Sequence, residues 1–266
     1  MILALNIGNS NITFGSYTPD GKLVFSSRLF ADTALSSDEL LYKMVNMLAL
    51  YGAEPQEITA IIFSSVVPAL TPRIREALRK MCEAPVMEVG PGLKSGVRIR
   101  MDNPAQLGGE LLCAVVGALR RAEPPLVVVN FDTATTLLAV DDTGALVGGA
   151  ILPGPQCSLA SLVKNTAQLP QVELEAKPRR LLGTNTADCL HSGIVHGTSA
   201  MLDGMVAQFR AALHADAAPV IATGTLQILG IISSPTGKRS SWTACLPSGS
   251  AIPAGKPPTN QTNTAA

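Results

Sequence analysis

Two segments of this 266-residue chain, 124 residues apart, contain the same order of features. The first is the apolar run 2–5, which ends in the polar turn Asn6-Ile7-Gly8-Asn9-Ser10-Asn11. The second is the apolar run 126–129, which ends in Asn130-Phe131-Asp132-Thr133. In each case a second strand, an Asp-Gly-type turn and a third strand follow. Such a repeat predicts two similar α/β halves, each with a strand meander followed by helices.

Helical and strand patterns occupy the chain between the two segments. Ser36-Ser37-Asp38-Glu39 is a capping-box signature for a helix that Gly52 would end. Residues 60–67 are expected to form a buried strand. Thr71-Pro72 predicts an N-cap and a first-turn proline, opening a helix through about Met81. A further helix is expected over 106–121.

Charge is distributed unevenly, although the chain has 20 basic and 20 acidic residues. This balance argues against a dedicated nucleic-acid-binding protein. Asp216 is the last acidic residue, and residues 233–266 contain five prolines and three glycines without any helical or strand period. We therefore expect a first half over 1–122, a second half over 123–232 and a disordered tail over 233–266.

Targeting signals and cysteine usage bear on the compartment. The N-terminus has no positively charged segment and no cleavage pattern of a signal peptide. No apolar run reaches the roughly 20 residues that span a bilayer, so no membrane partner is expected. The five cysteines are odd in number and form no C-x-x-C pair, which argues against a disulfide framework or a structural zinc site. We expect a reduced, cytoplasmic protein.

The two polar turns are candidate phosphate-binding loops. Duplication would bring them face to face across a cleft, where backbone N–H groups and small hydroxyls can bind an anion. Other nucleotide motifs do not fit, because six residues separate Gly230 from Gly237 where a P-loop has four. No G-x-G-x-x-G follows a strand, and no G-x-S-x-G elbow is present.

Several segments, in order, resemble the motifs of the type III pantothenate kinases over about residues 1–226. Asn6-Ile7-Gly8-Asn9-Ser10-Asn11 is similar to the first phosphate loop, D-x-G-N-T-N, and Asn130-Phe131-Asp132-Thr133-Ala134-Thr135-Thr136 to the second, D-F-G-T-A-T-T. Asp102-Asn103-Pro104, followed by Gly108-Gly109-Glu110-Leu111, resembles Y-D-N-P…G-A-D-R, which holds pantothenate and the catalytic aspartate. Further similar segments are 64–68, 89–92, 148–154, 166–170, 183–186 and 221–224.

The resemblance implies a fold, a reaction and partners. The fold would be α/β, with duplicated actin-like (ribonuclease H-like) halves whose mixed sheets are flanked by helices. The reaction would be ATP-dependent phosphorylation of pantothenate to 4′-phosphopantothenate, the first step of coenzyme A biosynthesis. Members of the family act as homodimers with pantothenate near the subunit interface, and they use Mg²⁺ and a monovalent cation, K⁺ or NH₄⁺.

The resemblance also implies roles for individual residues. Glu110 would be the catalytic base, and Asn130 would stand at the position of the monovalent-cation ligand. The residues implied in ATP binding are Asn6, Gly8, Asn9, Ser10, Asn11, Thr133, Thr135 and Gly224. The residues implied in pantothenate binding are Met101, Gly108, Gly109, Glu110, Leu111 and Thr186.

This sequence departs from the family pattern at the positions that carry the chemistry. Asn6 and Asn130 replace the aspartates of the two phosphate loops, and Asp132 replaces a glycine. Glu110 replaces the catalytic aspartate, which displaces its carboxylate by one methylene. In the pantothenate segment, Met101 replaces a tyrosine and Leu111 an arginine.

These departures leave two alternatives to an active pantothenate kinase. One is a catalytically impaired or inactive homologue that binds nucleotide or pantothenate, since Asp132 adds a negative charge where phosphate would approach. The other is a phosphotransferase of the same superfamily with another substrate, because Met101 and Leu111 remove polar partners for pantothenate.

Overall fold

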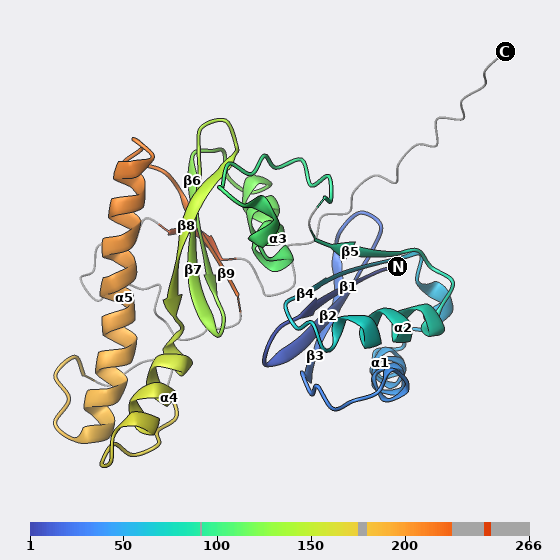
Figure 1. The fold of residues 1–266 in the computed structure, drawn as a ribbon, viewed down its shortest axis with the longest axis horizontal. Helices are drawn as coiled ribbons and strands as arrows, with labels where there is room; N and C mark the ends of the chain where they lie inside the picture. Colours follow the sequence, from blue (N-terminus) through green and yellow to red (C-terminus); the bar gives the residue numbers. More distant parts are fainter. Residues whose placement is uncertain (91, 175–179, 225–241, 246–266) are drawn as a thin grey trace.

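The computed structural model describes residues 1–90, 92–174, 180–224 and 242–245, and its strands form two five-stranded mixed sheets (Figure 1). Sheet A has the order β3-β2-β1-β4-β5, and sheet B has the order β10-β9-β6-β7-β8. The strands of sheet A are β1 (Ile2–Ile7), β2 (Asn11–Tyr17), β3 (Leu23–Phe30), β4 (Ala60–Ser65) and β5 (Val86–Val89). The strands of sheet B are β6 (Leu126–Phe131), β7 (Ala134–Val140), β8 (Leu146–Pro153), β9 (Val220–Gly224) and β10 (Trp242–Cys245).

The two sheets have the same topology. In sheet A, β1 pairs antiparallel with β2 and parallel with β4, and β2 and β4 continue to β3 and β5. In sheet B, β6 pairs antiparallel with β7 and parallel with β9, and these continue to β8 and β10. The prediction of duplicated α/β halves with mixed sheets is therefore confirmed.

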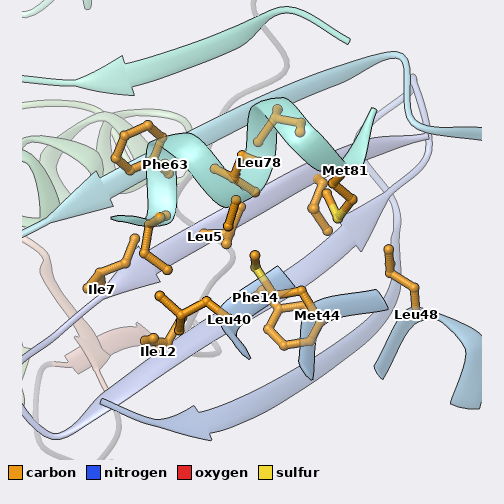
Figure 2. Close-up of a cluster of buried hydrophobic side chains, with 14 of the residues drawn as sticks. Leu5, Ile7, Ile12, Phe14, Leu40, Met44, Leu48, Phe63, Leu78 and Met81 are labelled. Atoms are coloured by element: carbon orange, nitrogen blue, oxygen red, sulfur yellow. The ribbon is translucent and has the colours of Figure 1, made fainter. Parts of the chain in front are cut away.

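Helices α1 (Ser37–Leu50) and α2 (Thr71–Met81) cover one face of sheet A (Figure 1). The capping box of α1 forms as expected, because the Ser36 hydroxyl accepts from the Glu39 N–H while the Glu39 carboxylate accepts from the Ser36 N–H. Figure 2 shows the buried cluster beneath them, in which Leu5, Ile7, Phe14 and Phe63 of the sheet meet side chains of both helices. A short 3₁₀ helix, η1 (Pro55–Glu57), precedes β4.

The start of α2 differs slightly from the prediction. Thr71 is the first helical residue rather than the N-cap, a position taken by Leu70 without a side-chain hydrogen bond. The Thr71 hydroxyl instead donates to Ser65 Oγ at 2.8 Å and lies 3.0 Å from the Val67 carbonyl oxygen. Its polar group therefore ties the helix to the end of β4.

Helix α3 (Gly109–Leu119) lies between the two sheets and follows the 3₁₀ helix η2 (Pro104–Gln106) (Figure 1). Because side chains alternate along a strand, β6 presents Leu126 and Val128 to α3 and Val127, Val129 and Phe131 to the opposite face. That opposite face is covered by the long helix α5 (Thr186–Ala212). Helix α4 (Pro155–Asn165) packs against the N-terminal part of α5.

The segment expected to be a disordered tail contributes the last strand of sheet B. Residues Trp242–Cys245 form β10, which pairs parallel with β9 at the position that β5 occupies in sheet A. For these four residues the expectation of disorder does not hold, because the free edge of β9 offers hydrogen-bonding groups that a short strand can pair with. The rest of 233–266 and the Gly230–Gly237 pattern lie outside the described residues. Within the described part of the chain, no helix has the length and apolar character needed to cross a membrane.

Gly109 sets how closely α3 approaches sheet A. A Cβ added there would lie 2.5 Å from the Val89 carbonyl oxygen and 2.8 Å from Ser64 Oγ. We expect Gly109→Ala to lower the free energy of unfolding by about 1–3 kcal/mol, because the backbone of β5 must shift. In β8, a Cβ on Gly148 would meet nothing within 4 Å, so Gly148→Ala is the matched control and should stabilise by about 0.5–1 kcal/mol. Urea unfolding of both variants checks this, and equal effects would contradict it.

Candidate active site

Two hairpin loops meet where β1 and β6 end. The β1–β2 turn closes with a hydrogen bond from the Gly8 N–H to the Asn11 carbonyl oxygen at 2.9 Å, and the β6–β7 turn with one from the Asp132 N–H to the Ala134 carbonyl oxygen at 3.0 Å. The Ser10 and Thr133 hydroxyl oxygens lie 3.5 Å apart. The two loops expected to bind phosphate therefore lie side by side, although 123 residues separate these two side chains in sequence.

The surroundings of the loops contain two close backbone approaches that only glycine allows. Gly154 is the N-cap of α4, and its Cβ would lie 2.4 Å from the Asp132 carbonyl oxygen. Gly224 ends β9 with a φ of 104°, and its Cβ would lie 2.0 Å from the Phe131 carbonyl oxygen. Exposed backbone and hydroxyl groups at Ser10 and Thr133, together with the N-terminus of α4, form a surface suited to anions.

Glu110 occupies the first turn of α3, between the two sheets. The Asn130 amide nitrogen donates a hydrogen bond to Glu110 Oε1 at 3.2 Å, and the Asn6 side chain hydrogen-bonds to the same carboxylate. Asn6 and Asn130 stand one residue before the end of β1 and β6 respectively. The repeated halves therefore place equivalent amides on two sides of one carboxylate.

The environment changes the acidity of this carboxyl group. Burial raises the pKa of Glu110, and the negative charge of Asp132 raises it further. Hydrogen bonds from Asn130 and Asn6 act in the opposite direction, because they stabilise the ionised form. The net shift is upward, which makes Glu110 a better proton acceptor than an exposed glutamate.

Each asparagine has hydroxyl neighbours across the strands. Asn6 pairs with Thr13 and Ser64 in the sheet register, and Asn130 pairs with Thr136 and Thr223. Neither Ser64, Thr136 nor Thr223 was assigned a role from the sequence. These residues can be recognised by their position directly opposite the asparagines in neighbouring strands. The order of residues in the sequence does not specify which strands pair, so they could not be identified from it.

Four buried oxygen atoms in β1, β4 and β7 have no hydrogen-bond partner among the described residues: Asn6 Oδ1, Ser64 Oγ, Thr135 Oγ1 and Thr136 Oγ1. Buried polar atoms are normally paired, so a group of such oxygens indicates a site that a ligand or water completes. Thr135 differs from the others in its position. It alternates with Thr136 along β7 and lies on the face of sheet B turned away from α3.

Three of the residues expected to contact pantothenate have surroundings other than the Glu110 carboxylate and the two loops. Met101 and Leu111 pack against the apolar cluster formed by α3 and sheet B. Thr186 is exposed at the first residue of α5, in the part of that helix that packs against α4 rather than against sheet B. Gly108 and Gly109, in contrast, begin α3 immediately before Glu110. Within one chain the structure therefore groups Glu110 with the glycines and leaves Thr186 apart.

Metal ligation by side chains alone is limited in this region. Across the described part of the chain, no three His, Cys, Asp or Glu side chains gather closely enough to hold a metal ion. Amide, hydroxyl and carbonyl oxygens, nucleotide phosphates and water are further ligands that a hard cation takes.

Comparison with known proteins relates this architecture to one family. A family model described as type III pantothenate kinase matches residues 2–208. A type III pantothenate kinase from Rubrobacter xylanophilus is 36% identical over 230 residues, covering 85% of this chain and 87% of that protein. One from Halalkalibacterium halodurans is 35% identical over 227 residues, covering 85% and 88%. The solved structure of an activator of 2-hydroxyisocaproyl-CoA dehydratase from Clostridium difficile, with bound ADPNP, has a TM-score of 0.51 at 9% identity, covering 94% of this chain and 89% of that one.

The unpaired hydroxyl of Thr136 leads to a prediction about stability. Thr136→Val removes a buried oxygen without a partner, so the variant should be as stable as the original or up to about 1 kcal/mol more stable. Thr71→Val is the matched control, because its hydroxyl is hydrogen-bonded, and it should lose about 0.5–1.5 kcal/mol. Chemical unfolding without ligand measures both. Equal destabilisation by the two substitutions would contradict the prediction.

Proposed function

This chain belongs to the type III pantothenate kinase family, and we propose that it transfers the γ-phosphoryl group of ATP to pantothenate, giving 4′-phosphopantothenate. The observation that carries the proposal is the position of Glu110. Its carboxylate lies between the side-chain amides of Asn6 and Asn130, close to the two hairpin loops that follow β1 and β6. This reaction is the first step of coenzyme A biosynthesis.

The two loops would bind the phosphates of ATP. Phosphoryl transfer depends mainly on positioning and on neutralising the charge of the γ-phosphate. Gly8 closes the first loop through its own N–H. The backbone N–H groups of Asn9, Ser10 and Thr133, with the hydroxyls of Ser10 and Thr133, can donate to phosphate oxygens. Asn11 and Gly224 border the same edge, and the buried Thr135 would support the second loop from behind.

Glu110 would accept the proton of the attacking pantothenate hydroxyl. Its raised pKa suits a general base. Gly108, the half-buried N-cap of α3, stands two residues before Glu110, and pantothenate would approach the carboxylate from that side. Met101 and Leu111 would act indirectly, by fixing α3 against sheet B.

A divalent cation fits the residues present. The unpaired Asn6 Oδ1 and the carboxylate of Asp132 are hard oxygen ligands of the kind that Mg²⁺ takes alongside nucleotide phosphates and water. When bound, Mg²⁺ would neutralise charge on the β- and γ-phosphates. Asp132 and Asn6 would hold the ion next to the first loop. The Asp132 carboxylate would then act as a metal ligand.

A monovalent cation does not fit at Asn130. The Asn130 side chain directs its amide nitrogen, a hydrogen-bond donor, toward Glu110. A nitrogen that carries two hydrogens does not ligate a cation, and the Asn130 oxygen is uncharged and, unlike Asn6 Oδ1, is not among the buried oxygens that lack a partner in the described residues. We therefore assign no step to K⁺ or NH₄⁺ at this position.

We further propose that the protein acts as a homodimer. Thr186 begins the part of α5 that packs against α4, whereas Glu110 lies on α3 between the two sheets. Pantothenate that contacts both would therefore take the two residues from different chains. Helix α5 offers a surface for this, since Gly193, Gly197, Ala200 and Gly204 are exposed and share one face by their spacing. Small residues of this kind allow two helices to approach closely.

A cytoplasmic location is part of the same proposal. Cys82, Cys113, Cys157 and Cys189 are free thiols, and two of them are exposed. Exposed free thiols are typical of a reducing compartment.

Binding without turnover is the alternative that one observation favours. A Cβ on Gly8 would lie 3.7 Å from Asp132 Oδ2, so this carboxylate stands close to the first loop and would repel phosphate if no cation neutralised it. Such a protein would bind nucleotide or pantothenate and release no ADP.

The base is tested by a substitution that keeps its shape. Glu110→Gln should lower kcat for ADP release with pantothenate by roughly 10²–10⁴-fold, because the amide cannot accept the proton. Glu110→Asp is the matched control and should keep the rate within roughly 100-fold, since only one methylene is lost. A coupled assay for ADP, with and without pantothenate, measures both.

The same assay separates kinase from binder. An unmodified chain that releases no more ADP than a blank, while Asn6→Asp/Asn130→Asp/Asp132→Gly turns over, would refute the kinase proposal. Thermal stabilisation by ATP without turnover would then support the binder.

The dimer is tested on α5. A Cβ at Gly197 meets nothing within 4 Å, so Gly197→Arg should fold normally as a monomer and disrupt only an interface. We expect sedimentation to give half the mass of the unmodified protein, with ADP release reduced in parallel. Tyr42→Arg, on the exposed face of α1, is the control. An unchanged mass for Gly197→Arg would count against the proposed interface.

A further inference from the structure

The carboxylate of Glu110 is held by uncharged groups on two sides. Asn130 donates from sheet B at 3.2 Å, and Asn6 hydrogen-bonds from the equivalent position of sheet A. Helix α3 carries Glu110 into the space between the sheets. The two halves of the fold therefore meet at one negative charge.

The charge balance of this cluster depends on those amides. Asp132 already adds a second negative charge close to Glu110. If residues 6 and 130 were also carboxylates, four acidic groups would surround a largely buried space, and like charges at hydrogen-bond distance repel strongly there. Such an arrangement would need a cation to hold it together. The amides satisfy the Glu110 oxygens without adding charge.

We propose that Asn6 and Asn130 hold the Glu110 carboxylate in place of a monovalent cation, and that this chain therefore works without one. Asn6 and Asn130 are positioning residues that act through Glu110. The inference rests on the proposed kinase function for its effect on the reaction, but the replacement of a cation by amides is a property of the folded protein and can be measured without turnover.

The first experiment compares melting temperatures in KCl and in tetramethylammonium chloride at equal ionic strength. The unmodified protein should melt at the same temperature in both salts. Asn130→Asp should melt at least about 5 °C lower in tetramethylammonium, because a carboxylate then faces Glu110, and KCl should restore part of the loss. A K⁺-dependent melting temperature of the unmodified protein would overturn the proposal.

A charge-swapped pair provides the rescue. The double variant Asn130→Asp/Glu110→Gln again places one amide against one carboxylate, so it should recover the melting temperature in tetramethylammonium and lose the K⁺ dependence. Asn46→Asp, at an exposed residue of α1 whose amide donates only locally to the Tyr42 carbonyl oxygen, controls for the substitution itself. No rescue by the double variant would show that the Asn130–Glu110 contact is not what the substitution breaks.

Kinase assays then separate the two proposals. With Mg²⁺-ATP and pantothenate, the unmodified protein should release ADP at rates that agree within twofold in the two salts, whereas Asn130→Asp should be at least tenfold faster in KCl. A tenfold fall for the unmodified protein on removing K⁺ would refute the inference and leave the kinase standing. No ADP release in either salt would refute the kinase, and the melting temperatures would still decide the role of the amides.

Discussion

The active site depends on how closely α3 can approach sheet A. Gly109 has no side chain, and the space that a Cβ would need is occupied by the Val89 carbonyl oxygen and the Ser64 hydroxyl. This contact brings the next residue, Glu110, between the sheets, where one amide from each half reaches it. A wider separation would leave the carboxylate in water with an ordinary pKa, and the two loops would lose their common partner.

The duplication was readable from the sequence because it rests on local patterns. Apolar runs, polar turns and a capping box at Ser36 depend on neighbouring residues, and each corresponds to an observed strand, loop or helix. The pairing of Asn6 with Ser64 and of Asn130 with Thr136 depends on strand register, which joins residues far apart. The position of Met101 and Leu111 in an apolar cluster likewise depends on packing between α3 and sheet B. The strand at Trp242–Cys245 was missed because its composition lacks a strand period and its partner is an open sheet edge.

The departures from the family pattern are linked in space. Asn6, Asn130, Glu110 and Asp132 belong to one cluster. Relative to the family pattern, the strand ends carry amides instead of two carboxylates, and the second loop carries an additional carboxylate, Asp132, whose charge acts on Glu110. Two amides, one lengthened carboxylate and one additional carboxylate together form a single rearranged charge distribution.

The position of β10 bears on the order in which the chain can fold. Sheet A uses only residues up to Val89, so all its strands are available early in synthesis from the N-terminus. The outer strand of sheet B comes from Trp242–Cys245, and its central strand β6 begins at Leu126. The second half therefore keeps the edge of β9 open until Trp242–Cys245 have been made, and during this interval that edge is exposed to pairing with other chains.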